Sequence, residues 1–193
     1  MSLLHDSLIV VDIEATCWDT PQPPPNQRRE IIEIGICLLD LSSFELSDTR
    51  SILVRPSHST ISEFCTNLTT LSAEMLDTEG ILFDEACQMM VDDFQSDQRL
   101  WGSWGSFDRR IFQEQCAFSN VTYPFSDKYV NIKTLYSKLY NNRQPIGMRG
   151  ALDQLELKLT GTHHRGVDDA VNITRILRLI LQQRGVGILK RYW

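Results

Sequence analysis

The chain has 193 residues and a formal net charge of −6 at pH 7. This length suits one domain with a buried core, which we expect over residues 1–193, with the core at about 7–183. Apolar runs fall short of the roughly 18 residues that a membrane-spanning helix needs, and a secretory signal pattern is missing, so we expect a cytoplasmic location. The acidic charge argues against a long nucleic acid held along the surface.

Cysteine usage points to the same compartment. The five cysteines are odd in number, scattered, and never spaced as CxxC. This pattern indicates reduced thiols rather than a disulfide framework or a zinc ribbon. They are Cys17, Cys37, Cys65, Cys87 and Cys116.

The opening stretch, SLIVVDIEATCW, places two carboxylates at the end of a strand. The apolar run from Leu8 to Val11 predicts a buried strand. Asp12 and Glu14 follow two residues apart, so their side chains point to the same face. Two like charges held this close repel each other, and burial increases the repulsion, so the pair needs a compensating partner.

A proline-bearing segment follows, DTPQPPPNQRR at residues 19–29. Its prolines predict an extended, solvated loop. The loop leaves the strand end beside the two carboxylates, so it forms either the rim of a site or a tolerated surface insertion.

Further along the chain, strands and helices alternate. Strands are predicted at 30–40, 50–56, 99–104 and 129–132, and helices at 83–94, 108–118, 133–140, 148–157 and 167–183, with a stop at Gly185. This order indicates an α/β domain whose mixed sheet begins as an antiparallel meander and continues with parallel crossovers. Ligands of such sheets bind at the carboxyl ends of strands, where Asp12 and Glu14 lie.

A third acid lies at the expected start of a helix. Asp108 follows an apolar strand and a glycine-rich turn in WGSWGSFDRRIF. It is either a further member of a site or an ordinary first-turn acid that stabilises the helix.

A histidine precedes an aspartate by five residues in GTHHRGVDDAVNITRILRLIL. Two registers fit this spacing, His163 with Asp168 or His164 with Asp169. The helix pattern favours the second, because Ile173 and the isoleucines that follow it mark the buried face, and four residues before Ile173 is Asp169. Asp168 falls on the polar face, so Asp169 is the inward acid and His164 its partner.

Four carboxylates and one histidine are thus expected at the ends of elements of a single domain. Carboxylates without cysteine ligands select hard cations, Mg²⁺ or Mn²⁺. Two such ions can clamp the attacking and leaving oxygens of a phosphoryl displacement, and a histidine can take the proton of the attacking water. The residues are Asp12, Glu14, Asp108, Asp169 and His164.

The motifs DIEAT and HRGVDDA, with Asp108 between them, resemble the DnaQ-like DEDDh group of 3′→5′ exonucleases. The similarity runs from about Ser7 to Leu181. DIEATCW, EIIEIGICLLD, FCTNLTTLSAEML and WGSWGSFD are most similar to the exoribonuclease branch that trims histone-mRNA and small-RNA 3′ ends, with bacterial KapD-type proteins nearby. The resemblance implies an RNase H-like fold with a central five-stranded mixed sheet flanked by helices.

The resemblance also implies roles for individual residues. The four acids would bind two metal ions, His164 would be the general base, and nucleoside 5′-monophosphates would leave one at a time from a free 3′-hydroxyl end. Leu68, Thr70 and Leu71 would line the pocket of the terminal nucleotide, although relatives often carry glycine where Thr70 stands. Trp18 would either stack on a base or lie half-buried beside the strand end. Four arginines near the motifs, Arg28, Arg29, Arg109 and Arg165, are either phosphate ligands or ordinary surface charges.

The favoured function is therefore a metal-dependent 3′→5′ exonuclease acting on single-stranded RNA ends or short oligoribonucleotides, with DNA left open. An acidic chain fits a short, end-on substrate better than a long duplex. Any extra affinity would come from a protein partner. The alternatives are a catalytically silent binding module on the same fold, which should have lost a site residue, and an RNase H-type endonuclease, which should lack His164.

Overall fold

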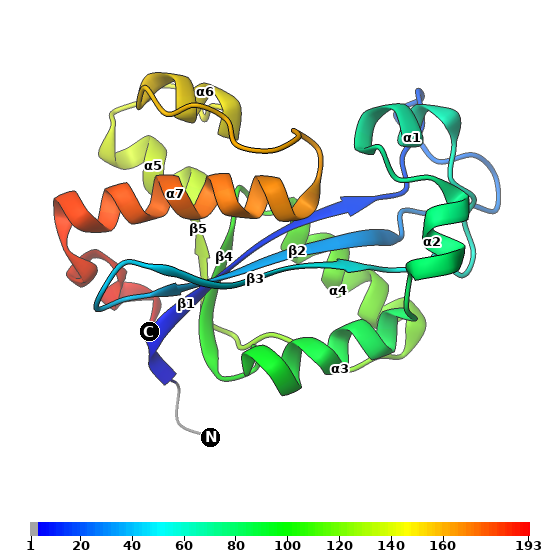
Figure 1. The fold of residues 1–193 in the computed structure, drawn as a ribbon, viewed down its shortest axis with the longest axis horizontal. Helices are drawn as coiled ribbons and strands as arrows, with labels where there is room; N and C mark the ends of the chain where they lie inside the picture. Colours follow the sequence, from blue (N-terminus) through cyan, green and yellow to red (C-terminus); the bar gives the residue numbers. More distant parts are fainter. Residues whose placement is uncertain (1–3) are drawn as a thin grey trace.

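The computed structural model describes residues 4–193, whose arrangement is shown in Figure 1. The strands are β1 (Leu4–Ala15), β2 (Ile31–Asp40), β3 (Leu46–Leu53), β4 (Arg99–Ser103) and β5 (Tyr129–Asn131). The helices are α1 (Glu63–Thr69), α2 (Ala73–Glu79), α3 (Phe83–Phe94), α4 (Phe107–Ser119), α5 (Ile132–Leu139), α6 (Met148–Gln154), α7 (Gly166–Arg184) and the 3₁₀ helix η1 (Val186–Tyr192). Within residues 4–193, none of the helices combines the length and apolar character needed to cross a membrane.

The five strands form one mixed sheet in the order β3-β2-β1-β4-β5. β2 runs antiparallel to β1 and β3 antiparallel to β2, whereas β4 is parallel to β1 and β5 parallel to β4. The predicted antiparallel meander followed by parallel crossovers is confirmed, as is the RNase H-like, five-stranded mixed sheet flanked by helices.

Helices cover both faces of the sheet, with α5, α6 and α7 on one face and α3 and α4 on the other (Figure 1). Successive side chains of β1 point alternately to these two helical layers. Leu8 and Val10 pack in the core under α7, while Ile9 and Val11 pack in the core over α3 and α4. Because the period of a strand is two, Asp12 and Glu14 continue the face that α7 covers.

Two short helices and the position of one strand differ from the prediction. α1 and α2 have seven residues each, too few to produce a readable helical period, and each begins at a capping serine. The hydroxyl of Ser62 accepts the Cys65 amide at 2.9 Å, and that of Ser72 accepts the Met75 amide at 3.1 Å. β3 begins at Leu46 rather than at residue 50, because the turn after Asp40 returns the chain at once to pair Leu46 with Leu39 of β2.

Candidate active site

Asp12 and Glu14 lie side by side at the end of β1, as predicted. Asp12 pairs with Gly35 and Glu14 with Glu33 in the antiparallel register with β2. Asp12 is half-buried and Glu14 is buried. Asp169 approaches from α7, and one carboxylate oxygen from each of the three acids lies within 4.8 Å of the others.

A backbone contact places Asp169 over the strand. α7 begins at Gly166, where an added Cβ atom would lie 3.0 Å from the Gly35 nitrogen and 3.1 Å from the Asp12 carbonyl oxygen. An added Cβ atom at Gly35 would lie 2.0 Å from the Gly166 carbonyl carbon, so the lack of side chains at this pair of glycines lets the helix start directly on the backbones of β1 and β2. Asp169 follows within the first turn and is buried, as the helical pattern predicted.

Asp108 also contacts β1, and it does so from the start of α4, the helix that follows β4. β4 ends at Ser103, and Asp108 lies in the first turn of α4. Its buried carboxylate accepts a hydrogen bond of 3.1 Å from the Ile13 amide, which lies beyond the last β1–β4 pair. Asp108 is therefore more than a first-turn acid, because it holds the backbone between the two carboxylates of β1.

Burial raises the pKa of each of the four acids. For Asp12 the charges of Asp108, Glu14 and Asp169 add to the effect, and its pKa lies well above the usual range. Burial, followed by the charges of Asp169 and Glu33, raises the pKa of Glu14 to about 8. Burial raises the pKa of Asp108 to about 6, against the opposing Ile13 hydrogen bond, and it also raises the pKa of Asp169.

This donor set fits a divalent cation. Carboxylate oxygens converge from β1 and α7, and their mutual repulsion and burial favour the protonated form in the absence of a positive charge. A hard cation among them would offset both penalties, which is the compensation that the Asp12–Glu14 pair requires.

The two histidines before α7 contact Asp169 in different ways. The His163 ring contacts the carboxylate, with Nδ1 2.9 Å from Oδ2, whereas His164 donates its backbone amide to the same oxygen at 3.1 Å. The expected pairing of His164 with Asp169 therefore exists through the backbone, and the ring pairing belongs to His163. His164 adopts the left-handed conformation (φ 65°), and its ring stacks on the His163 ring with the centroids 4.0 Å apart. One ring nitrogen of each histidine and one Asp169 carboxylate oxygen lie within 4.8 Å of one another. Burial, followed by the neighbouring His163, lowers the pKa of His164.

A fifth carboxylate, Glu33, was missed in the sequence. It faces Glu14 across β1 and β2 and is fully buried. Its oxygens accept hydrogen bonds from the Gly166 amide at 2.9 Å, from Ser51 Oγ at 2.6 Å and from Arg165 Nε at 3.1 Å. The signal available was an acid in the middle of the apolar run EIIEIGICLL. Glu33 thus joins β2, β3 and the start of α7 beneath the acidic cluster.

The expected nucleotide-pocket residues separate into exposed and buried ones. Leu68 is 36% exposed, and Thr70 is an exposed cap residue in the left-handed conformation (φ 64°), which explains why glycine suits this position. Leu71 is fully buried with Ile32, so it supports the segment from within. Trp18 is half-buried after the end of β1.

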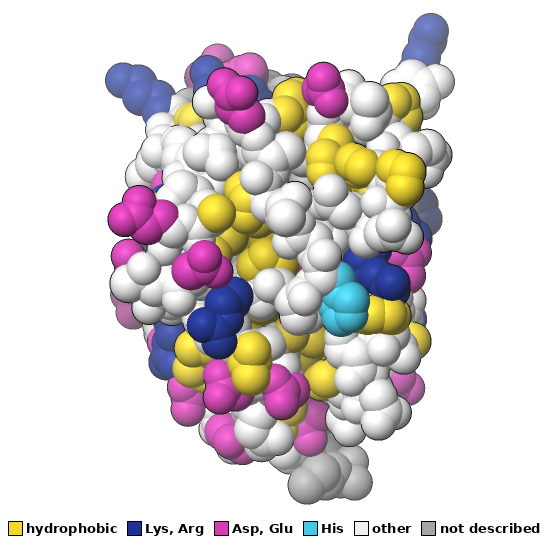
Figure 2. All heavy atoms as spheres, turned by 90° about the vertical axis from the view of Figure 1, so that its right-hand side faces the viewer, with side chains coloured by type: hydrophobic (Ala, Val, Ile, Leu, Met, Phe, Trp, Pro, Cys, Tyr) yellow, Lys and Arg dark blue, Asp and Glu magenta, His cyan; other side chains and the backbone are white. Residues whose placement is uncertain are grey.

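The four candidate arginines mostly contact other protein groups. Arg165 binds Glu33, and the Arg28 guanidinium carbon lies 3.4 Å from the centre of the Phe118 ring. Arg29 donates to the Pro21 carbonyl at 3.2 Å, and Arg109 lies over the Tyr129 ring. Figure 2 shows the side of the molecule on which α1 and α2 lie. Acidic and basic side chains are interspersed there and do not form a continuous basic surface.

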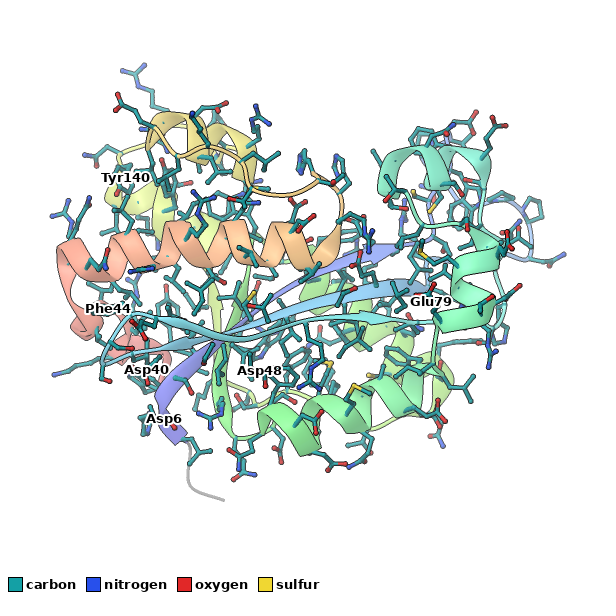
Figure 3. All side chains as sticks on the ribbon, in the orientation of Figure 1. Asp6, Asp40, Phe44, Asp48, Glu79 and Tyr140 are labelled. Carbon is teal, nitrogen blue, oxygen red and sulfur yellow. The ribbon has the colours of Figure 1, made fainter. Side chains whose placement is uncertain are left out.

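Other acids of the strands lie away from the cluster. Asp6 and Asp40 are found toward the far end of the sheet (Figure 3). Asp6 pairs with Arg99, and Asp40 accepts hydrogen bonds from the Ser42 and Ser43 amides in a turn.

Comparison with known proteins agrees with this geometry. The family model described as "Exonuclease" (RNase_T) matches residues 9–177, which include all four acids and both histidines. The chain belongs to this exonuclease family. The resemblance to DEDDh members is likewise confirmed, since this chain superimposes on the crystal structure of the nuclease domain of 3′hExo, described as a DEDDh family member bound to rAMP. That match has a TM-score of 0.84 and 29% identity, and covers 95% of this chain and 96% of the other.

Two curated relatives illustrate the range of similarity. The chain is 32% identical over 189 residues to 3′-5′ exoribonuclease 1 of Rattus norvegicus, covering 92% of this chain and 54% of the rat protein. It is 26% identical over 180 residues to the probable 3′-5′ exonuclease KapD of Bacillus subtilis (strain 168), covering 93% of this chain and 86% of that protein. The chain thus spans about half the length of the rat relative.

Proposed function

We propose that this protein is a metal-dependent 3′→5′ exonuclease that removes nucleoside 5′-monophosphates from the free 3′-hydroxyl end of single-stranded RNA or short oligoribonucleotides. The observation that carries the proposal is the convergence of Asp12, Glu14 and Asp169 within 4.8 Å in a chain of the exonuclease family. RNA is favoured because the rat relative is named an exoribonuclease and the 3′hExo structure is bound to rAMP.

Four acids would hold two Mg²⁺ or Mn²⁺ ions: Asp12, Glu14, Asp108 and Asp169. When bound, the ions supply positive charge that stabilises the attacking and leaving oxygens of the displacement. The raised pKa values of Asp12 and Glu14 support this assignment, because such carboxyls gain most from a nearby cation.

His164 would accept the proton of the attacking water. Its lowered pKa keeps the ring neutral near pH 7, and a ring nitrogen lies within 4.8 Å of an Asp169 carboxylate oxygen, beside the proposed metal site. His163 would position Asp169 through the 2.9 Å contact of its ring. Leu68 and Thr70 would contact the terminal nucleotide together with Trp18, while buried Leu71 supports their segment.

The cellular setting is part of the same proposal. The five cysteines are free, as expected for a reducing cytoplasm. Because the surface lacks a broad basic stripe on the face in Figure 2, a protein partner would supply any affinity for longer RNA.

The test compares 5′-labelled single-stranded RNA and DNA of one sequence with Mg²⁺, Mn²⁺ or EDTA. We expect a ladder that shortens from the 3′ end only when a divalent ion is present, with RNA consumed faster. An intact band in every lane, from folded protein, would favour a silent binding module instead.

A further inference from the structure

Cys17 and Cys65 form a pair of thiols beside the candidate active site. Cys17 follows Glu14 by three residues, and Cys65 lies in α1. One hydroxyl joins their backbones, because Ser62 Oγ donates to the Cys17 carbonyl at 2.6 Å and accepts the Cys65 amide at 2.9 Å. Cys17 packs against the small apolar cluster that contains Cys65, and Cys65 Sγ lies 3.8 Å from the Ala15 carbonyl oxygen, two residues before Cys17.

The two thiols differ in access to solvent. Cys65 is fully buried in a small apolar cluster against which Cys17 packs, whereas Cys17 is half-buried at the surface. An oxidant can therefore reach the pair from the Cys17 side. The neighbouring Cys17 thiol lowers the pKa of Cys65 to about 7, which increases the thiolate fraction of Cys65, while the same interaction raises the pKa of Cys17.

We propose that Cys17 and Cys65 are a redox-sensitive modification site, which a hydroperoxide converts into an intrachain disulfide that ties α1 to the end of β1 and lowers turnover. The effect on turnover rests on the proposed exonuclease function, whereas formation of the bond rests on the geometry of the two thiols alone.

The chemistry balances with the hydroperoxide as the only co-reactant. One thiol gives up two electrons to the peroxide, forming a sulfenic acid and releasing water or an alcohol. The second thiolate then attacks the sulfenyl sulfur, the S–O bond breaks, and water leaves as the S–S bond forms. A dithiol reductant returns both sulfurs to thiols.

A Cys17–Cys65 disulfide would change the position of α1 relative to the end of β1. The two sulfurs must close to the S–S bond length of about 2.05 Å. β1 is held in the sheet, so the movement falls on α1, which carries Leu68 and ends at the Thr70 cap. A shift of the nucleotide-contacting segment against Glu14 misplaces the substrate, and a displacement of about 1 Å can reduce turnover by roughly 10²-fold.

A second thiol pair provides a matched comparison. Cys87 of α3 and Cys116 of α4 lie in one core cluster between α3, α4 and the sheet, where they are 3% and 5% exposed. Removal of Cys116 therefore leaves the proposed site intact while deleting one thiol from an equivalent pair.

The test exposes the reduced full-length chain to hydrogen peroxide, alkylates the remaining thiols and maps disulfide-linked peptides by mass spectrometry. We expect a Cys17–Cys65 linked peptide in the wild type and in Cys116→Ala, and none in Cys17→Ser. In parallel, RNA turnover should fall roughly tenfold or more in the wild type and recover with dithiothreitol, while Cys17→Ser keeps its activity. Recovery separates the disulfide from methionine oxidation, which dithiothreitol does not reverse.

Absence of the linked peptide from oxidised wild-type protein would overturn the proposal, and this result does not depend on the folding of any variant. A linked peptide with unchanged RNA turnover would overturn the effect on α1. If the reduced protein shows no nuclease activity at all, the proposed function fails, while the peptide map still decides whether the bond forms.

Discussion

Gly166 at the start of α7 lies directly against Gly35 of β2, and a Cβ atom added to Gly35 would fall 2.0 Å from the Gly166 carbonyl carbon. This contact sets how far α7 stands above the sheet. Because Asp169 follows within one turn and Asp12 pairs with Gly35, the same contact sets the separation of the two acids.

Gly35→Ala should therefore damage both stability and the site. Backbone atoms cannot move aside as a flexible side chain could, so we expect a loss of about 2 kcal/mol or more in the free energy of unfolding. Metal affinity should fall as well, since Asp169 is displaced from Asp12. The measurements are urea unfolding and Mn²⁺ titration, with Gly147→Ala as the control because nothing lies within 4 Å of its added Cβ. Equal behaviour of the two variants would contradict this account.

The Glu33–Arg165 pair should show strong coupling in a double-mutant cycle. Glu33 is fully buried, so Arg165→Met leaves a carboxylate without its counter-charge beside Glu14 and should reduce stability by about 3 kcal/mol. Glu33→Gln combined with Arg165→Met should recover most of this loss, because the remaining amide still accepts the Gly166 hydrogen bond. Chemical denaturation of the four proteins gives the coupling energy, and simple additivity of the two single changes would argue against the pair.

The two adjacent histidines should differ in their effect on turnover. His164→Ala removes the proposed general base and should lower kcat by about 10²–10⁴-fold with metal affinity largely retained. His163→Ala removes a ring that contacts Asp169 and should act mainly on metal affinity. Steady-state rates at saturating and limiting Mn²⁺ distinguish these effects. If His163→Ala shows the large fall in kcat and His164→Ala does not, the assignment of the base is reversed.

Without a divalent ion, stability should fall as the pH rises from about 5 to 8. Burial and like charges raise the pKa of Glu14 to about 8 and burial raises that of Asp108 to about 6, so the folded state binds more protons than the unfolded state across this range. The favourable contribution is complete at low pH and is lost as the pH rises through the folded-state values. We expect the Tm in EDTA to fall by about 5 °C or more, and Mn²⁺ to restore it at pH 8. Glu14→Gln should flatten the profile, and a Tm in EDTA that rises toward pH 8 would disagree.

Much of the fold and part of the site could be predicted from local patterns. The spacing of Asp12 and Glu14 on a strand, and the step from Ile173 back to Asp169 on a helix, depend only on the period of each element. The α1 and α2 helices escaped prediction because seven residues carry too little periodicity. Local patterns also do not predict contacts between residues that lie far apart in the sequence.

Glu33 illustrates that limit most clearly. Its partners are Ser51 and Arg165, which lie 18 and 132 residues away along the chain. Similarly, the ring that hydrogen-bonds Asp169 is that of His163, whereas His164 contributes its backbone amide, a difference that residue spacing does not encode.

The most direct test of the central claim follows 5′-labelled RNA with Mn²⁺ in wild type, Asp169→Asn and the neighbouring control Asp168→Asn. The RNA carries either a 3′-hydroxyl or a 3′-phosphate. We predict stepwise shortening from the 3′-hydroxyl end by the wild type and by Asp168→Asn, and none by Asp169→Asn, with the 3′-phosphate RNA left intact. Internal cleavage of the 3′-phosphate RNA, or equal shortening by Asp169→Asn, would contradict a 3′→5′ exonuclease that works through this acidic cluster.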